Sequence, residues 1–243
     1  MSLRAARRAV ALGWALALVI CRFWQLSLRG PLTLESRALW MQSSCRLVLD
    51  SLGVHYRVEG APPTTGLVVA NHLGYLDILI LSAAMPCFFV SKMEIGRWPF
   101  FGAAARAAGT IFLDRSSLAS ANSVAEMIGK RLKGPVPVLL FPEGTTSDGS
   151  RVLPFRSRLI APATAAGAPI TAAAIRYVID GGIEERELCW IGDAAFLPHL
   201  WKTLGTPGFS AVVHFGQPRL YPDRRSAADA TRAEISAMRA ELP

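Results

Sequence analysis

The chain has 243 residues, which is enough for one sizeable α/β domain with an appendage but cramped for two independent domains. Its hydrophobic fraction of 51% and charged fraction of 18% make it more hydrophobic than a typical soluble enzyme. Its net charge of +8 suits it to an anionic membrane surface. Zinc-finger, RNA-binding and dense basic-helix signatures are missing, so we expect no nucleic-acid partner.

The N-terminus predicts a membrane anchor. Residues 9–21 are apolar and uncharged, with arginines on both flanks. As a helix this run is about 20 Å long, short of the roughly 30 Å hydrocarbon core, so we expect it not to cross a bilayer alone. Positive charge on both flanks favours a segment that stays on the cytoplasmic side, which predicts a protein at the cytoplasmic face of the inner (plasma) membrane. A cleaved signal peptide is the alternative, but no small-x-small cleavage site follows Cys21.

Residues 31–52 carry apolar side chains at helical spacing and predict a second helix, which Gly53 ends. We therefore expect a membrane-associated two-helix appendage over residues 1–53 and a catalytic domain over residues 54–243. The second helix either forms a hairpin with the first at the membrane surface or packs on the sheet of the catalytic domain.

The remaining chain alternates short strand candidates with helical stretches, which predicts an α/β fold with a mostly parallel mixed sheet flanked by helices. The expected strands are residues 55–58, 67–70, 87–91, 110–113, 136–141, 170–176, 188–191 and 211–215. The expected helices are residues 75–84, 95–107, 118–133, 154–165 and 227–242.

The stretch GLVVANHLGYLD, residues 66–77, carries the first candidate chemistry. A buried strand over residues 67–70 delivers His72 to the carboxyl edge of the sheet, where open α/β sheets bind ligands. Five positions along one helix would set His72 and Asp77 about 140° apart, so a turn at Gly74 has to bring them together. A histidine held by a carboxylate is a general base. The alternative is that Asp77 simply caps the following helix.

Three further blocks accompany this one, and together they resemble the glycerolipid acyltransferase family that includes 1-acylglycerol-3-phosphate acyltransferases. The blocks are N-H-x4-D at Asn71, His72 and Asp77, GTIFLDR at residues 109–115, FPEGT at residues 141–145, and a looser match, APITAAAI, from Ala168. The resemblance implies acyl transfer by His72 and Asp77 from acyl-CoA or an acyl carrier protein to a lysolipid, with no cofactor.

Two basic residues follow expected strands and are candidates for binding an anionic headgroup. The resemblance assigns Arg115 to phosphate, which a guanidinium can bind with two hydrogen bonds. A salt bridge with Asp114 or another carboxylate is the alternative. Lys92 is expected to attract a headgroup or the phosphate of the acyl donor, or else to pair with Glu94 on the surface.

The FPEGTTS loop supplies the other substrate-binding candidates: Glu143, Gly144 and Thr145. Pro142 and Gly144 predict a tight loop whose backbone N–H groups, with the Thr145 hydroxyl, hold a ligand oxygen. Glu143 is expected either to accept a hydrogen bond from a substrate hydroxyl or to orient the loop.

One departure from the family pattern bears on the acceptor. Thr146 stands where members that form phosphatidic acid usually carry Arg, so one phosphate-binding charge is missing. On the family pattern we expect 1-acylglycerol-3-phosphate as acceptor. The alternatives are lyso-ornithine lipid, a zwitterionic lysophospholipid, or a silent membrane-binding protein of the same fold. Metal-binding and phosphate-loop patterns are missing, as is G-x-S-x-G, so we expect no metal and no serine hydrolase.

Overall fold

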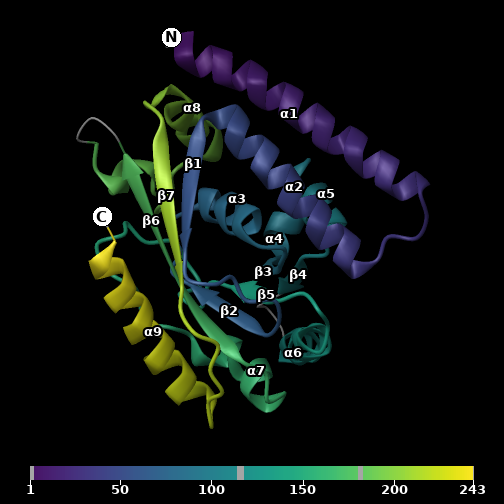
Figure 1. Cartoon of the computed structure of the whole chain (residues 1–243), viewed down its shortest axis with the longest axis vertical. Coiled ribbons are helices and arrows are strands. Elements are labelled where there is room, and N and C mark those ends of the chain that lie inside the picture. Colours follow the sequence, from purple (N-terminus) through teal and green to yellow (C-terminus); the bar gives the residue numbers. More distant parts are fainter. Residues whose placement is uncertain (1–2, 114–117, 180–182, 243) are drawn as a thin grey trace.

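A computed structural model describes residues 3–113, 118–179 and 183–242 and shows a seven-stranded sheet in the order β1-β7-β6-β2-β5-β3-β4 (Figure 1). The β6–β7 pair is antiparallel and the other neighbours run parallel, so the predicted mostly parallel mixed sheet is confirmed. The strands are β1 (Val54–Glu59), β2 (Leu67–Ala70), β3 (Phe88–Lys92), β4 (Ile111–Leu113), β5 (Val138–Leu140), β6 (Ile170–Ile179) and β7 (Phe209–Phe215).

Helices cover both faces of this sheet. α3 (Tyr75–Ala84) packs on one face, and α6 (Leu118–Leu132), α7 (Ala161–Ala165) and α9 (Arg224–Glu241) cover the other. In β2 the side chains alternate between the two cores: Val68 and Ala70 join the first, whereas Leu67 and Val69 join the second. A strand buried on both faces must be apolar throughout, which explains the uninterrupted LVVA sequence.

The N-terminal helix is longer than the sequence predicted. α1 (Leu3–Leu28) is continuous over 26 residues because Arg22 does not end it, so it measures about 39 Å. By length and composition alone it is long and apolar enough to cross a bilayer, so the 13-residue run underestimated the length of the apolar helix, and the expectation that it stays on one side of the bilayer remains a prediction. α1 packs on α2 (Leu34–Leu52), and α2 packs on α3, so the hairpin and the contact with the catalytic domain coexist.

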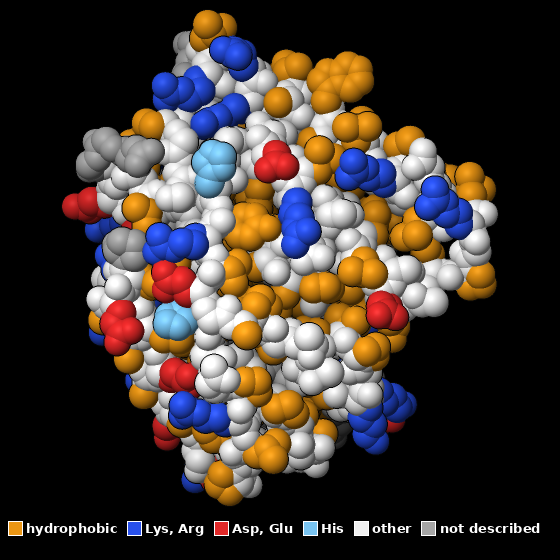
Figure 2. Space-filling model, in the orientation of Figure 1, with side chains coloured by type: hydrophobic (Ala, Val, Ile, Leu, Met, Phe, Trp, Pro, Cys, Tyr) orange, Lys and Arg blue, Asp and Glu red, His pale blue; other side chains and the backbone are white. Residues whose placement is uncertain are grey.

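The outer face of α1 is apolar and unburied. Five large side chains along it are 47–71% exposed: Val10, Trp14, Leu18, Ile20 and Trp24. In Figure 2, hydrophobic side chains with Lys and Arg between them line the edge of the molecule that α1 occupies. Exposing such a surface to water is unfavourable, whereas burying it among lipid tails is favourable. This face therefore supports association with a membrane.

The single helix expected over residues 95–107 is divided in two. α4 (Met93–Gly96) and α5 (Phe101–Ala107) flank a break at Pro99 and Phe100. Proline lacks the N–H that a continuous helix needs, and Phe100 has a positive φ of 60°, which interrupts helical geometry. The break leaves the Phe100 side chain 83% exposed.

Two other expectations were wrong, and one helix was missed. Residues 185–188 form a 3-10 turn, η2 (Glu185–Leu188), and residues 189–191 join no strand, because the Trp190 backbone bonds to loops instead. Residues 154–160 form only the turn η1 (Ser157–Leu159), since the Arg156 N–H donates to the Pro142 carbonyl. α8 (Phe196–Gly205), which packs on α1, was not predicted.

Candidate active site

The two candidate catalytic residues lie where β2 ends and α3 begins. His72 Nδ1 lies 2.8 Å from Asp77 Oδ2, so the turn brings the side chains together as their spacing predicts. An ionised carboxylate only accepts hydrogen bonds, so Nδ1 carries the hydrogen and Nε2 keeps its lone pair. The imidazole stacks on the Phe141 ring, with 3.9 Å between ring centroids, and the His72 side chain remains 18% exposed. This histidine can accept a proton from an approaching hydroxyl.

Asp77 is fully buried, and its carboxylate is held on both oxygens. Oδ2 accepts from the N–H groups of Leu73 at 2.6 Å and Gly74 at 3.0 Å as well as from His72. Oδ1 accepts from the Tyr177 hydroxyl. Because Asp77 bonds the Gly74 N–H at the start of α3, it also caps that helix. The contact with His72 and the helix cap are therefore made by the same carboxylate, and the catalytic role of the pair remains a prediction.

Gly74 serves a different purpose from the one expected. Its φ of 169° is extended backbone that any residue adopts. A Cβ at this position would lie 3.2 Å from both Cβ and N of Trp190, closer than ordinary contact distance. The Trp190 N–H also donates to the Leu73 carbonyl at 2.9 Å. Gly74 is thus needed for the close approach of Trp190 to the turn of residues 72–77, which carries the two candidate catalytic residues and is called the catalytic turn below.

The loop after β5 is bonded to the catalytic turn through Glu143. This side chain is 3% exposed, and its two oxygens accept from the N–H groups of His72 at 2.9 Å and Leu153 at 3.2 Å. The His72 carbonyl in turn accepts from the Ser147 N–H at 2.8 Å. Of the two roles expected for Glu143, this geometry matches the orientation of the loop.

The N–H groups expected to be open to a ligand are partly used within the loop. Gly144 N–H donates to the Phe141 carbonyl at 3.1 Å, and Gly144 adopts a φ of +72°. The exposed Arg156 side chain lies against Gly144, where a Cβ would come within 2.8 Å of Nε. Thr145 is exposed, whereas the Thr146 hydroxyl donates to the Trp190 carbonyl at 2.5 Å. Thr145 and the neighbouring Arg156 side chain are thus exposed to solvent at this loop.

The two basic candidates have different outcomes. Lys92 ends β3 and is exposed, and no ion pair joins it to Glu94. β3, β4, β5 and β2 run parallel, so Lys92 lies at the carboxyl end of its strand, at the same edge of the sheet as His72. Arg115 and its alternative partner Asp114 lie outside the described residues.

An aromatic cluster lies beside the catalytic turn. It consists of Tyr75, Trp98, Phe101, Trp190 and Phe196, whose rings pack edge to face with centroids 5.1–6.4 Å apart. All five rings remain partly exposed. Tyr75 follows His72 by only three positions, so an apolar surface adjoins the candidate base. Such a surface can accommodate hydrocarbon chains.

A family model described as Acyltransferase matches residues 54–176, a span that includes the catalytic turn and the FPEGT loop. The lyso-ornithine lipid O-acyltransferase of Rhodobacter capsulatus is 36% identical over 79% of this chain and 72% of its own. The chain belongs to the acyltransferase family. The 1-acyl-sn-glycerol-3-phosphate acyltransferase of Neisseria meningitidis is 38% identical over 74% of this chain and 72% of its own.

The fold of this acyltransferase also matches a crystal structure. The 1-acyl-sn-glycerophosphate (LPA) acyltransferase PlsC from Thermotoga maritima superposes with a TM-score of 0.71. The match covers 99% of this chain and 98% of that one at 19% identity, so it shows a shared fold, including the N-terminal helices.

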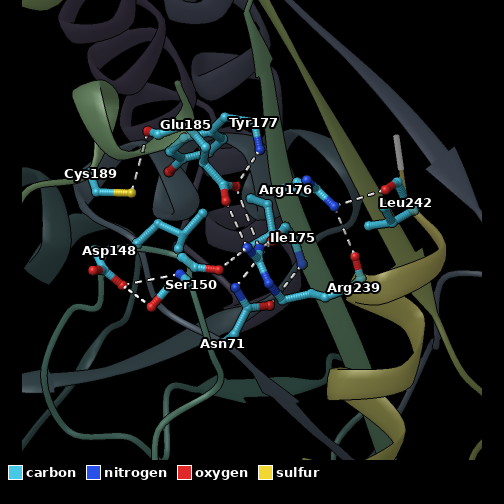
Figure 3. A network of polar contacts seen from close by, with 12 residues as sticks. Asn71, Asp148, Ser150, Ile175, Arg176, Tyr177, Glu185, Cys189, Arg239 and Leu242 are labelled. Atoms are coloured by element: carbon cyan, nitrogen blue, oxygen red, sulfur yellow. Dashed lines mark hydrogen bonds and ion pairs between the residues drawn. The ribbon is translucent and has the colours of Figure 1, made fainter. Parts of the chain in front are cut away.

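Sequence reasoning missed three contributors to the site of this acyltransferase. Tyr177 reaches Asp77, and the Trp190 backbone bonds both the turn at Leu73 and the loop after β5 at Thr146. The buried Arg239 of α9 pairs with Glu185 at 2.7 Å and also bonds the carbonyls of Ile175 and Gly149 (Figure 3). A lone tyrosine in the apolar run ITAAAIRYVI was the one available signal.

Glu143 yields a prediction about pH. Burial raises the pKa of its carboxyl to about 7, an effect that outweighs the lowering by the His72 and Leu153 N–H groups. Between an ordinary value of 4.5 and about 7 the folded state then binds more protons than the unfolded state, so stability falls as pH rises. We predict that the unfolding free energy of the wild type declines through this window relative to that of Glu143→Gln, by at most about 1.4 kcal/mol per pH unit.

Urea unfolding in detergent at several pH values, followed by tryptophan fluorescence, measures both slopes. The Glu143→Gln variant has one hydrogen-bond acceptor fewer, which shifts its unfolding free energy by the same amount at every pH. This shift does not affect the comparison of slopes. Parallel pH dependences for the two proteins would contradict the raised pKa.

Proposed function

We propose that this acyltransferase moves a fatty acyl group from acyl-CoA or an acyl carrier protein to the free hydroxyl of a lysolipid, with His72 as general base. The observation that carries the proposal is the bond between His72 Nδ1 and the buried Asp77. This pair lies at the sheet edge where the turn of residues 72–77 meets the FPEGT loop. The partly exposed imidazole beside an apolar aromatic surface suits a substrate that joins a hydroxyl to a hydrocarbon chain.

In the proposed reaction the acceptor hydroxyl gives its proton to His72 Nε2 while its oxygen attacks the thioester carbonyl carbon. Asp77 stabilises the imidazolium that forms. The tetrahedral intermediate then collapses: the carbon–sulfur bond breaks, the imidazolium returns its proton to the departing thiolate, and the new ester is released. No covalent enzyme intermediate and no cofactor are needed.

We predict that His72→Ala lowers the turnover of acyl transfer by at least about 10²-fold, the lower range for loss of a general base. The assay is purified protein in detergent or vesicles with a labelled acyl donor and mixed lysolipids. His55→Ala is the matched control, because His55 is exposed on β1.

Near-native transfer by a folded His72→Ala protein would refute the general-base role. A wild type that transfers to no acceptor would instead establish a silent membrane-binding protein that keeps the fold.

We also propose that the outer face of α1 lies in a membrane, on its cytoplasmic side. The support is the exposed apolar face together with arginines before and after it. Lysolipid acceptors reside in bilayers, and α1 packs on α8, which begins with Phe196 of the aromatic cluster. This arrangement connects the proposed membrane face with the apolar surface beside His72.

We predict that Trp14→Glu with Leu18→Glu weakens partitioning onto vesicles at least about tenfold, because each large apolar side chain contributes about 1.5–3 kcal/mol. Both side chains point outward, so the packing of α1 on α2 is kept. Gln25→Glu with Ser27→Glu is the matched control, since it adds the same charge at exposed polar positions of the same helix.

Sedimentation with vesicles containing anionic lipid measures the bound fraction. If the Trp14/Leu18 variant sediments as fully as the control, the attachment lies elsewhere.

For the acceptor we propose lyso-ornithine lipid. Thr146 places no charge after EGT, and its hydroxyl is bonded to the Trp190 carbonyl, whereas the exposed Arg156 lies against Gly144 of this loop. An ornithine headgroup, with one carboxylate and one ammonium, demands less positive charge than a phosphate dianion. The similarity to the Rhodobacter capsulatus enzyme supports the same choice.

The second candidate acceptor is 1-acylglycerol-3-phosphate. The exposed Lys92 and the family role of Arg115 support it, as does the similarity to the Neisseria meningitidis enzyme.

We predict that the wild type prefers lyso-ornithine lipid and that Thr146→Arg shifts the ratio of kcat/KM values toward 1-acylglycerol-3-phosphate by about tenfold or more. A charge-assisted hydrogen bond to phosphate contributes roughly 1.5–3 kcal/mol, which sets this magnitude. Thr146→Val is the control, because it removes the bond to Trp190 without adding charge and should affect both acceptors equally.

An acceptor panel at a fixed acyl donor provides the measurement. A wild type that already prefers 1-acylglycerol-3-phosphate, with the ratio unchanged in Thr146→Arg, would establish the second candidate instead.

A further inference from the structure

β6 continues past the point where its neighbour β2 ends. The ladder between them closes with Ala70 opposite Ala173. Beyond it, the Asn71 side chain takes the place of a strand backbone: its Oδ1 accepts from the Ile175 N–H at 2.8 Å, and its Nδ2 donates to the Ile175 carbonyl at 3.1 Å. This extra pairing holds β6 beside the catalytic turn, and the next residue on the same face of β6 is Tyr177.

Tyr177 contributes to the buried end of the site. Its side chain is 2% exposed, and its hydroxyl donates to Asp77 Oδ1. The other three donors, on His72, Leu73 and Gly74, all reach Oδ2. Among the described residues, Tyr177 is therefore the one donor to the second carboxylate oxygen.

We propose that Tyr177 is a positioning residue for acyl transfer: its hydroxyl holds the Asp77 carboxylate in the orientation that presents Oδ2 to His72 and tunes how strongly Asp77 stabilises the imidazolium. This inference rests on the proposed function of His72 and Asp77. Without the phenol, Oδ1 would be a buried acceptor with no donor, and the carboxylate would lose the contact that opposes its rotation.

The phenol is suited to permanent donation. Burial, followed by the charge of Asp77, raises the pKa of Tyr177 well above its ordinary value, so the hydroxyl keeps its proton throughout the working pH range. Cys189 and Glu185 also raise the pKa of Tyr177, whereas His72 bonds Asp77, and the charge of Asp77 acts on Glu143. Glu185 and Arg239 compensate each other as a buried ion pair.

That ion pair also braces the backbone of Tyr177. The Tyr177 N–H donates to Glu185 Oε1 at 2.8 Å, and Glu185 Oε2 pairs with Arg239 at 2.7 Å (Figure 3). Arg239 is 7% exposed and also bonds the Ile175 carbonyl on the same strand. The C-terminal helix α9 thus fixes the projecting end of β6, so the backbone of Tyr177 is held by Glu185 while its hydroxyl is held by Asp77.

We predict that Tyr177→Phe lowers kcat about tenfold or more with KM for both substrates unchanged, because a hydrogen bond to a charged group is lost but no substrate contact is. The acidic limb of the kcat/KM profile should move to higher pH, since the carboxylate keeps more negative charge and stabilises the imidazolium more strongly. Tyr56→Phe is the matched control: its hydroxyl also donates one bond, to the Ala83 carbonyl at 3.1 Å.

A double-mutant cycle with Asp77→Asn separates positioning from stability. If Tyr177 acts through Asp77, adding Tyr177→Phe to Asp77→Asn causes little further loss of kcat. Independent, multiplying losses, or a Tyr177→Phe enzyme with wild-type kcat and pH profile, would overturn the inference. If one of these outcomes is found while His72→Ala is inactive in the same assay, the positioning role of Tyr177 is refuted and the proposed function stands. A fully active His72→Ala would refute the proposed function and this inference together.

Discussion

The geometry of the site depends on providing hydrogen-bond donors to one carboxyl group in a place that water does not reach. Burying such a polar group without partners is costly in free energy. Asp77 avoids this with four donors, three on the catalytic turn and one on β6. Because the donors come from segments far apart in the sequence, the turn, the sheet and the position of His72 are mutually dependent.

The same dependence extends to the loop after β5. Glu143 accepts the His72 N–H, the His72 carbonyl accepts from Ser147, and Trp190 joins both loops through its backbone. The bonds to the His72 N–H, the His72 carbonyl and the Leu73 carbonyl use backbone groups that the end of β2 leaves without a ladder partner, and buried backbone groups need partners. The loops are therefore ordered by the requirements of the strand end, before any substrate binds.

Local signals in the sequence predicted the parts of the site that lie within a few residues of one another. The LVVA run, the turn and the helix from Tyr75 follow from apolar patterning and from spacing, so the contact between His72 and Asp77 was predictable. Tyr177 lies 100 positions from Asp77, and Arg239 lies 54 from Glu185. No periodicity reports such pairings, because they depend on how far β6 projects and where α9 docks.

The errors in the fold have a similar physical origin. A short apolar run such as residues 188–191 fits a strand and an irregular buried segment equally well, and here loop contacts decided the outcome. The division of residues 95–107 depends on Pro99 and on a positive φ at Phe100, and only the proline is visible in the sequence. In α1, apolar residues beyond Arg22 continue the helix because a single arginine can extend its charge into water.

At position 146, binding of the acceptor headgroup competes with the hydrogen bond that holds the loop in place. An arginine at 146 would add a cation for the headgroup but could not reproduce the hydroxyl bond that ties Thr146 to the Trp190 carbonyl. That carbonyl belongs to the residue packed against Gly74, so loosening it disturbs the turn that carries His72. Arg156 reaches the loop from outside, over Gly144, and brings charge without breaking that bond. On the proposed assignment the enzyme keeps an ordered loop with the exposed Arg156 beside it, which suits a headgroup that carries one carboxylate.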